Sequence, residues 1–178
     1  MRGLRRRLAA EAPDAAFRAA ALLPLERLVQ TGVVAIYYAQ GSELDPTPLA
    51  ERLMQAGAAP ALPAARSRDG LLQFHRWRPG ESLEPDVVGV PSPPHASAAV
   101  TPDLVVAPLL AFDRRGGRIG QGGGHYDRTL ENLRRLGRVF VLGLAYAGQE
   151  VEAIPMEPHD QRLDAILTEA GYIEVAKG

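Results

Sequence analysis

Apolar residues in this chain gather into short continuous runs that alternate with amphipathic segments. Residues 33–39, 103–112 and 138–146 form the three strongest runs and are rich in Val, Leu and Ala. Runs of this kind predict strands that are buried on both faces of a parallel sheet. Residues 71–77 alternate instead between apolar and polar positions, which predicts a half-exposed strand. Shorter strands are expected at residues 59–64, 165–169 and 172–175.

The segments between these runs have the composition of helices. Residues 2–11 and 15–30 are rich in Ala, Leu and Arg, and they predict two helices that are separated at Pro13. Residues 126–136 predict a further helix between the second and third buried strands. Residues 79–101 contain many Pro, Ser and Gly residues and are expected to be irregular.

Residues 45–57 carry signals for both ends of a helix. Asp45 can cap the first turn, Pro46 suits the first helical position, and Gly57 can end the helix. The alternation of strands and helices predicts a three-layer α/β fold, in which a mostly parallel, Rossmann-like sheet is flanked by helices on both faces. In such a sheet, ligands bind beyond the carboxyl ends of the strands.

Length and charge narrow the possible functions. The chain has 178 residues and a mass of 19.1 kDa, which predicts a single domain over residues 1–178. Its 20 basic and 21 acidic residues give a net charge of -1, which disfavours nucleic acid as a partner. No apolar run is long enough to span a bilayer, and Glu11 and Pro13 interrupt the basic start, so we expect neither a membrane segment nor a targeting peptide.

The cysteine content and the surface pattern give two further expectations. The chain contains no Cys, which excludes disulfides, thiolate metal ligands and cysteine nucleophiles. This composition fits a cytoplasmic protein in a reducing compartment. No long exposed apolar stripe is evident in the sequence, so we expect a monomer.

The segment GGRIGQGGGHYDRTL, residues 116–130, is the strongest functional signal. Its glycines allow successive backbone N–H groups to line a concave anion site, and the N-terminus of the following helix adds positive potential. Arg118 and Arg128 can supply charge to phosphate oxygens. A carboxylate in the same place, that of Asp127, indicates a bridging Mg²⁺. The chemistry expected of this segment is therefore the binding of a polyphosphate with its metal.

Two common phosphate-binding motifs do not fit the segment. A P-loop would continue with Lys and Ser or Thr, and the dinucleotide-binding fingerprint would have its third glycine where His125 stands. From the residues alone, a flexible strand–helix connection, with Asp127 favouring its helix N-terminus, stays an alternative, but the two Arg and the Asp around the glycines favour phosphate binding.

Several blocks of the chain together resemble one enzyme family, the 5-formyltetrahydrofolate cyclo-ligases, also called 5,10-methenyltetrahydrofolate synthetases. APLLAFDRRGGRIGQGGGHYDRTL is similar to the family signature of a buried strand, Ala-Phe-Asp, and a glycine loop that closes with Tyr-Asp. YYAQGSELDPTPL resembles the folate-side segment, GLAYAGQ the next strand with its Gln, and IPMEPHDQRLDAILTE the Pro-x-Glu-x-His-Asp element and closing strand. The resemblance covers nearly the whole chain and is strongest over residues 107–169.

The resemblance implies an activity and a set of site residues. The activity is ATP-dependent cyclisation of 5-formyltetrahydrofolate to 5,10-methenyltetrahydrofolate, with release of ADP and phosphate, through a phosphorylated formyl group. Catalytic roles fall on Arg118, Tyr126 and Gln149, and the folate is expected to contact Glu43, Tyr146 and Gln149. Mg²⁺ is expected at Asp127 and Asp160. ATP is expected to contact Arg2, Arg6, Arg118, Gly120, Gln121, Gly122, Gly123, Gly124, His125 and Tyr126.

Several alternatives stay open at this point. Arg2 and Arg6 have the spacing of the family's N-terminal Lys and Arg, but Met1 and Arg5 have it too. Taken alone, Asp160 is better read as a cap of the following turn, and Glu43 can be read as a polar loop residue. Two other functions compete with the cyclo-ligase, namely a phosphate- or nucleotide-binding module and a sugar-phosphate isomerase-like enzyme on a similar scaffold. Lys177 is the only lysine in the chain, and no Lys/Glu proton-transfer pair is evident near the loop.

Overall fold

The centre of the protein is an eight-stranded sheet with strand order β12-β11-β10-β7-β1-β2-β3-β6. The structure is a computed structural model, and it describes the chain except for residues 29–31, 138 and 177–178. The central strands are parallel to one another. They are β1 (Val33–Ala35), β2 (Ala59–Ala65), β7 (Leu104–Pro108), β10 (Phe140–Leu144) and β11 (Ala165–Thr168).

Antiparallel strands complete the sheet at both sides. The last strand, β12 (Gly171–Glu174), pairs antiparallel with β11. At the other side β3 (Leu72–Arg76) pairs antiparallel with β2, and β6 (Ala99–Val100) pairs antiparallel with β3. The predicted mostly parallel sheet is therefore confirmed, with antiparallel strands limited to its margins.

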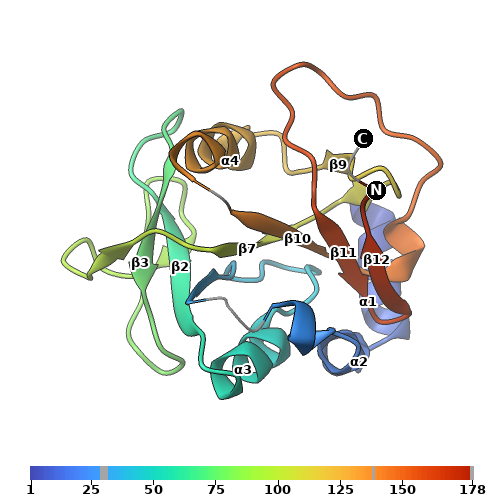
Figure 1. Cartoon of the computed structure of the whole chain (residues 1–178), viewed down its shortest axis with the longest axis horizontal. Coiled ribbons are helices and arrows are strands. Elements are labelled where there is room, and N and C mark those ends of the chain that lie inside the picture. Colours follow the sequence, from blue (N-terminus) through green and yellow to red (C-terminus); the bar gives the residue numbers. More distant parts are fainter. Residues whose placement is uncertain (29–31, 138, 177–178) are drawn as a thin grey trace.

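Helices cover both faces of this sheet, which confirms the three-layer architecture. Figure 1 shows α4 (His125–Leu136) on one face and α2 (Ala15–Ala21) with α3 (Thr47–Gln55) on the other. A 3₁₀ turn, η1 (Leu25–Arg27), follows α2. Within the described part of the chain, no helix combines the length and the apolar character needed to cross a bilayer.

The burial of β7 explains why its sequence is continuously apolar. Leu104 and Val106 belong to the core cluster on the α2–α3 face, whereas Val105 and Ala107 belong to the cluster on the α4 face. Successive side chains of a strand point to opposite faces, so both sets must be apolar when both faces are covered.

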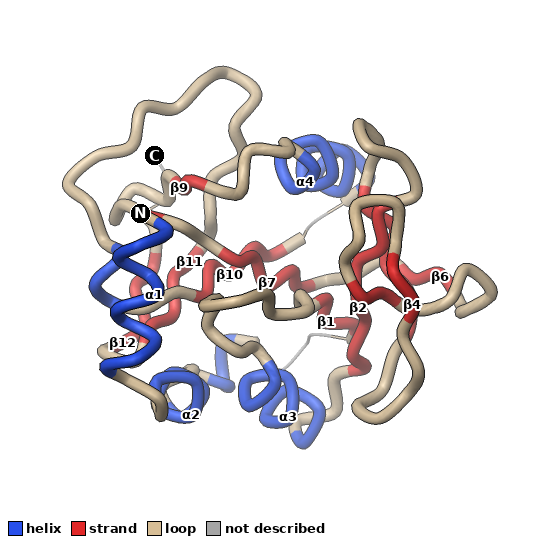
Figure 2. The backbone as a smooth tube through the Cα atoms, turned by 180° about the vertical axis from the view of Figure 1, so that it is seen from behind, coloured by secondary structure: helices blue, strands red, loops and turns tan. Residues whose placement is uncertain are grey.

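Helix α1 (Arg2–Glu11) lies beside the sheet and packs against η2 (Ala147–Gln149), the turn that follows β10 (Figure 2). The packing is close, because a Cβ on Gly148 would lie 2.7 Å from Leu8 Cδ2. Helix α1 is thereby held near the carboxyl ends of β10 and β7, where the sequence predicts the site.

All three predicted buried strands are longer than the strands that form. The first ends at Ala35, although Ile36 and Tyr37 stay buried and the Tyr37 hydroxyl donates a hydrogen bond to the Leu44 carbonyl. Burial in an ordered loop therefore produced the same apolar pattern as a strand. The second, residues 103–112, divides into β7 and β8 (Ala111–Phe112), and β8 pairs with β9 (Arg118–Ile119) in a separate hairpin.

The third buried strand is also shorter than predicted, because β10 covers only residues 140–144 of the range 138–146. Arg138 lies outside the described residues. The helix predicted at 126–136 begins one residue earlier, at His125, and ends at Leu136 as expected.

The predicted helix 15–30 is also wrong at its end. Helix α2 stops at Ala21, and Pro24 then restricts Leu23 and separates the helix from η1. The last two residues of the prediction lie outside the described residues. By contrast, a helix does form within the range predicted at 45–57. It begins one residue later than the cap signals predicted, because Pro46 is the N-cap residue, while Asp45 accepts a hydrogen bond from the Thr47 N–H at 2.9 Å and Gly57 follows the helix with a φ of 101°.

Residues 79–101 contain more order than predicted. A small hairpin forms from β4 (Glu84–Pro85) and β5 (Pro91–Ser92). Its turn is organised by Asp86, whose carboxylate accepts N–H hydrogen bonds from Ala65, Val88 and Val90. A side chain that satisfies three backbone donors replaces the ladder hydrogen bonds that such a short hairpin lacks.

Candidate functional site

The candidate site lies where loops after β1, β7 and β10 meet helix α1. The glycine-rich segment after β7 has two parts with different surroundings. Its first part is the turn of the β8–β9 hairpin, residues 113–117, and its second part is residues 120–124, which we call the glycine loop. The two parts are separated by β9, so one run of glycines in the sequence serves two local structures.

Asp113 organises the hairpin turn. Its buried carboxylate accepts hydrogen bonds from the N–H groups of Arg115, Gly117 and Ile154, at 2.8 to 2.9 Å. Burial alone would raise the pKa of Asp113, but these three donors and the Arg115 guanidinium lower the pKa below its ordinary value. Gly117 therefore directs its N–H to Asp113, and the expectation that Gly117 lines the anion site is wrong.

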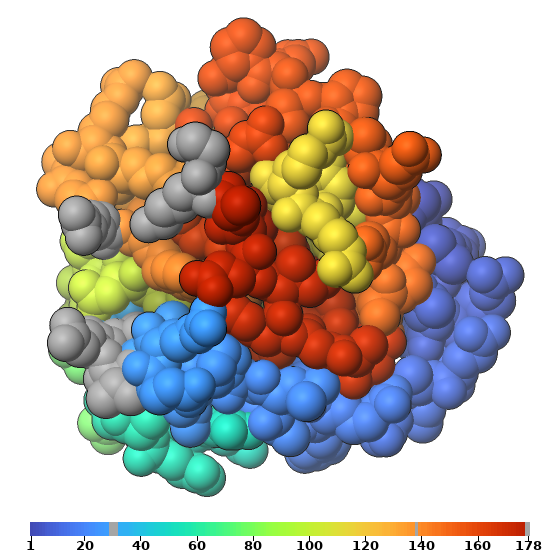
Figure 3. Space-filling model, turned by 45° about the vertical axis from the view of Figure 1, so that its right-hand side comes forward, coloured from blue at the N-terminus to red at the C-terminus, as the bar shows by residue number. Residues whose placement is uncertain are grey.

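The hairpin turn is packed against the end of the chain. Gly116 has a φ of 82°, and a Cβ at this position would lie 2.7 Å from the Leu163 carbonyl oxygen and 3.0 Å from Val175 Cγ1. The Leu163 N–H donates to the Gly116 carbonyl at 2.9 Å. Figure 3 shows this turn in yellow, seated beside the red C-terminal strands.

The glycine loop has open space where the hairpin turn has neighbours. A Cβ on Gly120 or Gly122 would meet nothing within 4 Å. Gly124, with a left-handed φ of 63°, is the N-cap residue of α4, so the loop ends at a helix N-terminus. Arg128 reaches back from α4, and its Nη2 donates to the Gly123 carbonyl at 2.9 Å. The loop thus has free volume beside backbone N–H groups, a helix dipole and a nearby cation.

Glu43 is a buried ion-pair partner rather than an exposed loop residue. Its side chain and that of Arg5 are each only 7% exposed, and Arg5 Nη1 lies 3.3 Å from Glu43 Oε1. The backbone N–H of Gln40 donates to Oε2 at 3.0 Å. Arg5 is itself held by Ser42 Oγ at 3.2 Å and by the Leu109 carbonyl at 3.5 Å. The carboxylate is therefore fixed by α1 and by its own loop.

Gln121 joins the glycine loop to this ion pair and to α1. Its Nε2 donates to Glu43 Oε1 at 3.1 Å, and its Oε1 accepts from Arg2 Nη2 at 3.1 Å. Three residues predicted from the sequence for two different ligands are thus in direct contact. Beside them is a pocket of about 420 Å³, lined by Arg2, Arg5, Arg6, Gly41 and Ser42.

Arg118 and Asp127 form a second, separate ion pair. Arg118 Nη2 lies 2.8 Å from Asp127 Oδ1, and the Arg118 side chain is only 5% exposed. The same Oδ1 accepts the Gln161 N–H at 3.0 Å, and Arg118 donates to the Gln161 carbonyl. Asp160 caps a turn, as one of the two interpretations of the sequence proposes, but the turn precedes it, because its Oδ2 accepts the Glu157 N–H at 2.7 Å.

Gln149 and Tyr146 lie at the carboxyl end of β10. Both ends of the Gln149 amide are bonded to backbone: Nε2 donates to the Leu109 carbonyl at 2.8 Å, and Oε1 accepts the Tyr146 N–H at 2.9 Å. The Leu109 carbonyl also accepts from Arg5, so it links Gln149 to the Glu43 ion pair. Burial, and next the charge of Glu169, raises the pKa of Tyr146.

Two further phenols surround Glu43. Burial raises the pKa of Tyr126, and the negative charge of Glu43 raises it further. Burial and the same carboxylate raise the pKa of Tyr37. Both phenols therefore stay neutral at physiological pH and add no negative charge to the site, and the Tyr37 hydroxyl uses its proton on the Leu44 carbonyl.

Sequence reasoning assigned no role to Tyr37 or Asp113, and it left Arg5 as the unchosen alternative to Arg2 and Arg6. A signal for Arg5 was available, because helical spacing places it on the same face as Leu8, Ala9 and Ala12, which are partly buried in the core. An arginine on the apolar face of a helix indicates a buried partner. Asp113 stands in the Ala-Phe-Asp of the family signature, but its role has no signal in the sequence, since its three donors come from residues whose positions depend on the folded hairpin.

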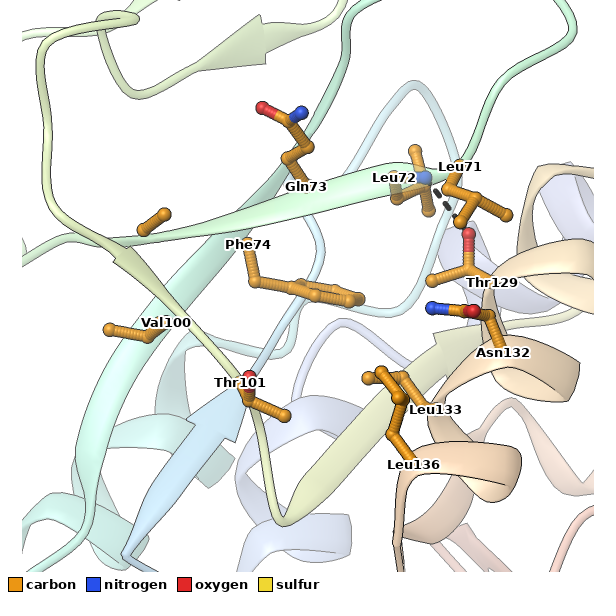
Figure 4. Close-up of a pocket in the computed structure, with 11 residues that line it drawn as sticks. Leu71, Leu72, Gln73, Phe74, Val100, Thr101, Thr129, Asn132, Leu133 and Leu136 are labelled. Atoms are coloured by element: carbon orange, nitrogen blue, oxygen red, sulfur yellow. Dashed lines mark hydrogen bonds between the residues drawn. The ribbon is translucent and has the colours of Figure 1, made fainter.

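A second pocket lies away from these residues. It has a volume of about 300 Å³ and lies between β3, β6 and the end of α4 (Figure 4). Thr129 Oγ1 accepts the Leu72 N–H at 2.9 Å across it. The described residues that line it are mostly apolar and include none of those predicted for ATP, folate or metal.

Comparison with known proteins gives a consistent picture. The model of the family described as the 5-formyltetrahydrofolate cyclo-ligase family matches residues 1–169. A 5-formyltetrahydrofolate cyclo-ligase of Escherichia coli (strain K12) is 35% identical over 146 residues, which cover 79% of this chain and 80% of that protein. The 5-formyltetrahydrofolate cyclo-ligase of Mycolicibacterium smegmatis is 34% identical over 142 residues, which cover 76% of this chain and 72% of that protein.

Solved structures extend the similarity to the fold. The 5,10-methenyltetrahydrofolate synthetase of Aquifex aeolicus, solved by NMR, has a TM-score of 0.72 and 25% sequence identity with this chain. The match covers 100% of this chain and 86% of that structure. Sequence and structure therefore point to the same group of proteins.

Proposed function

Because the chain belongs to the 5-formyltetrahydrofolate cyclo-ligase family, we propose that it catalyses the ATP-dependent cyclisation of 5-formyltetrahydrofolate to 5,10-methenyltetrahydrofolate. One observation supports this assignment most strongly. The glycine loop and the Glu43 loop are in direct contact through Gln121, so a phosphate site and a folate site would share a border. Transfer of a phosphoryl group from ATP to the folate requires the two substrates to lie this close together.

The glycine loop is the proposed site of the ATP phosphates. Gly120 to Gly124, with His125 and Tyr126 at the start of α4, provide backbone N–H groups and the positive end of the helix. Arg118 is the proposed cation at the transferred phosphoryl group. Arg2 and Arg6 line the adjoining pocket and would hold the remaining phosphate charge.

The folate is proposed to bind against Glu43. A pterin presents adjacent N–H donors, and a carboxylate is their natural acceptor. Gln149 shares the Leu109 carbonyl with Arg5, and with Tyr146, whose N–H it accepts, it would bound the formyl side of the site. Because the Gln149 amide is bonded to backbone at both ends, contact with the substrate would be made through the lone pair and hydrogen that remain.

The reaction proposed from the family has two steps that balance. The formyl oxygen attacks the γ-phosphorus of ATP, so an O–P bond forms while the bond to the ADP oxygen breaks. The neighbouring folate amine then attacks the activated carbon and gives up its proton to phosphate or solvent, and the ring closes as the C–O bond breaks and phosphate leaves. The protein residues align the reacting atoms and stabilise charge, and no covalent enzyme intermediate is needed.

Asp127 and Asp160 have the chemistry of a Mg²⁺ site of the kind that depends on substrate phosphates. Both hydrogen bonds that Asp127 accepts from described residues go to Oδ1, and Asp160 uses Oδ2 for Glu157. Among the described residues, no three His, Asp or Glu side chains gather closely enough to hold a metal alone. Mg²⁺ usually takes one or two carboxylates and completes its shell with water and phosphate oxygens, and when bound it would neutralise phosphate charge.

The direct test follows the methenyl chromophore after 5-formyltetrahydrofolate is mixed with the enzyme, with and without MgATP. We expect product only with MgATP. Asp127→Asn should lower kcat by about 100-fold or more, because the charge that would hold the metal is lost. The amide can still accept from Arg118 and Gln161, so folding should survive.

Glu131→Gln is the matched control, since Glu131 lies on the same helix and, among the residues that the structure describes, pairs with exposed Arg135 alone. Its kcat should equal that of the parent. Full activity in Asp127→Asn would rule out the metal role of Asp127. A binding module would give no product in any variant, and an isomerase would leave both 5-formyltetrahydrofolate and ATP unconsumed. A cytoplasmic location and a monomeric state stay predictions from the sequence.

A further inference from the structure

The hydrogen bonds of Glu43 leave little room for another ligand. An ionised carboxylate has about four lone-pair positions. Arg5 and Gln121 donate to Oε1, and the Gln40 N–H donates to Oε2. Three positions are therefore occupied, and the proposed folate would bring more than one N–H donor. At least one present donor must leave before a pterin can bind with two hydrogen bonds.

The three donors differ in how easily they can leave. Arg5 is buried and has additional hydrogen bonds to Ser42 and to the Leu109 carbonyl, so its removal would strand a buried charge. The Gln40 N–H belongs to the backbone of the same loop as Glu43. Gln121 is uncharged, exposed and carried by the glycine loop. Its departure is the least costly of the three.

We propose that Gln121 is an exchangeable donor, which satisfies Glu43 in the free enzyme and is displaced by the N–H groups of the folate. The proposal rests on the proposed function, since it takes the folate as the ligand of Glu43. It assigns Gln121 a positioning role toward Glu43 and makes this residue a determinant of folate affinity.

Displacement of Gln121 would also affect the glycine loop and Arg2, the proposed contacts of the ATP phosphates. The same amide accepts from Arg2 on α1, so in the free enzyme it ties the glycine loop to both α1 and Glu43. When the folate takes the place of Gln121, this tie is broken at Glu43, and the glycine loop and Arg2 are released together. Folate binding would thereby prepare the glycine loop and Arg2 for phosphate contacts.

Titration calorimetry with 5-formyltetrahydrofolate and no nucleotide tests the exchange, because binding is then separated from turnover. Gln121→Met keeps the length of the side chain but removes its donor and acceptor. The folate no longer has to break the Gln121–Glu43 bond, so its Kd should fall by about two- to tenfold, the range for one net hydrogen bond. Gln121→Asn, which stays polar but is too short to span both partners, should give the same direction of change.

The matched control is Gln55→Met, an exposed glutamine at the end of α3 outside the site. Its Kd should equal that of the parent. In the ligand-free protein, amide hydrogen exchange of residues 120–124 should also be faster in Gln121→Met than in the parent, because the tie to Arg2 and Glu43 is gone.

The outcomes distinguish failure of the Gln121 exchange from failure of the proposed function. If the parent binds 5-formyltetrahydrofolate and both Gln121 variants bind it equally well or more weakly, the exchange is wrong, and Gln121 contacts the substrate or is irrelevant to it. If the parent does not bind this folate at all, the proposed function fails and the exchange fails with it. Tighter binding in both variants with faster exchange of the loop supports the proposal.

Discussion

The hairpin turn (residues 113–117) and the glycine loop (residues 120–124), the first and second halves of the glycine-rich segment, are close in sequence but differ in what surrounds them. In the hairpin turn, a Cβ on Gly116 or Gly117 would lie 2.7 Å from the Leu163 oxygen or 2.9 Å from Asp113 Oδ2. In the glycine loop, a Cβ on Gly120 would meet nothing within 4 Å. The glycines of the first half therefore make room for the protein itself.

Gly120 and Gly122 in the second half leave space that the free protein does not use. Glycine loses more chain entropy on folding than alanine, so glycine beside open space lowers stability, and ligand binding would explain why it is kept. The comparison separates stability from binding: a methyl group added at Gly116 in the first half should disturb folding, and one added at Gly120 in the second half should disturb ligand binding.

Gly116→Ala should have the largest effect on stability. The left-handed φ and the contact with the Leu163 backbone together should cost about 3 kcal/mol or more. Thermal unfolding should then show a midpoint lower by roughly 10 °C. The kcat per folded molecule should be retained at low temperature. A midpoint within 2 °C of the parent's, on the order of experimental scatter, would show that the turn tolerates a side chain.

The hairpin turn should also give the protein an acid-sensitive contribution. The pKa of Asp113 is lower in the folded state than its ordinary value of 3.8. Its stabilising effect is therefore complete above that value and is lost as the pH falls through the folded-state pKa. Asp113→Asn should lower the free energy of unfolding at pH 7 by about 1–3 kcal/mol.

Urea unfolding of parent and variant at several pH values between 7 and 3 checks this effect. The difference in the free energy of unfolding between parent and variant should narrow below about pH 4, where the carboxyl of Asp113 begins to take up a proton in the unfolded state. Parallel curves over the whole range would mean that Asp113 has the same pKa in both states.

The central strands were predictable because parallel strands covered on both faces have no polar positions. The apolar runs that contain β7 and β10 located those strands, and the signals at Asp45 and Gly57 placed α3. The ends of strands were less predictable. Ile36 and Tyr37 are as buried as a strand but lie in a loop, and an apolar run does not distinguish the two.

The site was predictable in its chemistry but not in its contacts. The glycines and Asp127 were identified from the residues themselves and Glu43 through the family resemblance, yet the link through Gln121 depends on α1 and two loops meeting in space. Arg5 was passed over for Arg2 and Arg6 because the spacing of the family motif fits both registers, and the apolar helix face that marks Arg5 was not used. Hydrogen bonds between distant segments have no local signature in the sequence.

The smallest effect on stability, and the most direct test of the central claim, is expected for Gly120→Ala. The new methyl group has open space and φ lies outside the left-handed range, so the unfolding midpoint should stay within about 2 °C of the parent's. Calorimetric titration with MgATP should nevertheless show a Kd at least about tenfold higher, because the methyl group enters the volume proposed for phosphate. An unchanged Kd for MgATP in a well-folded Gly120→Ala protein would contradict phosphate binding by the glycine loop.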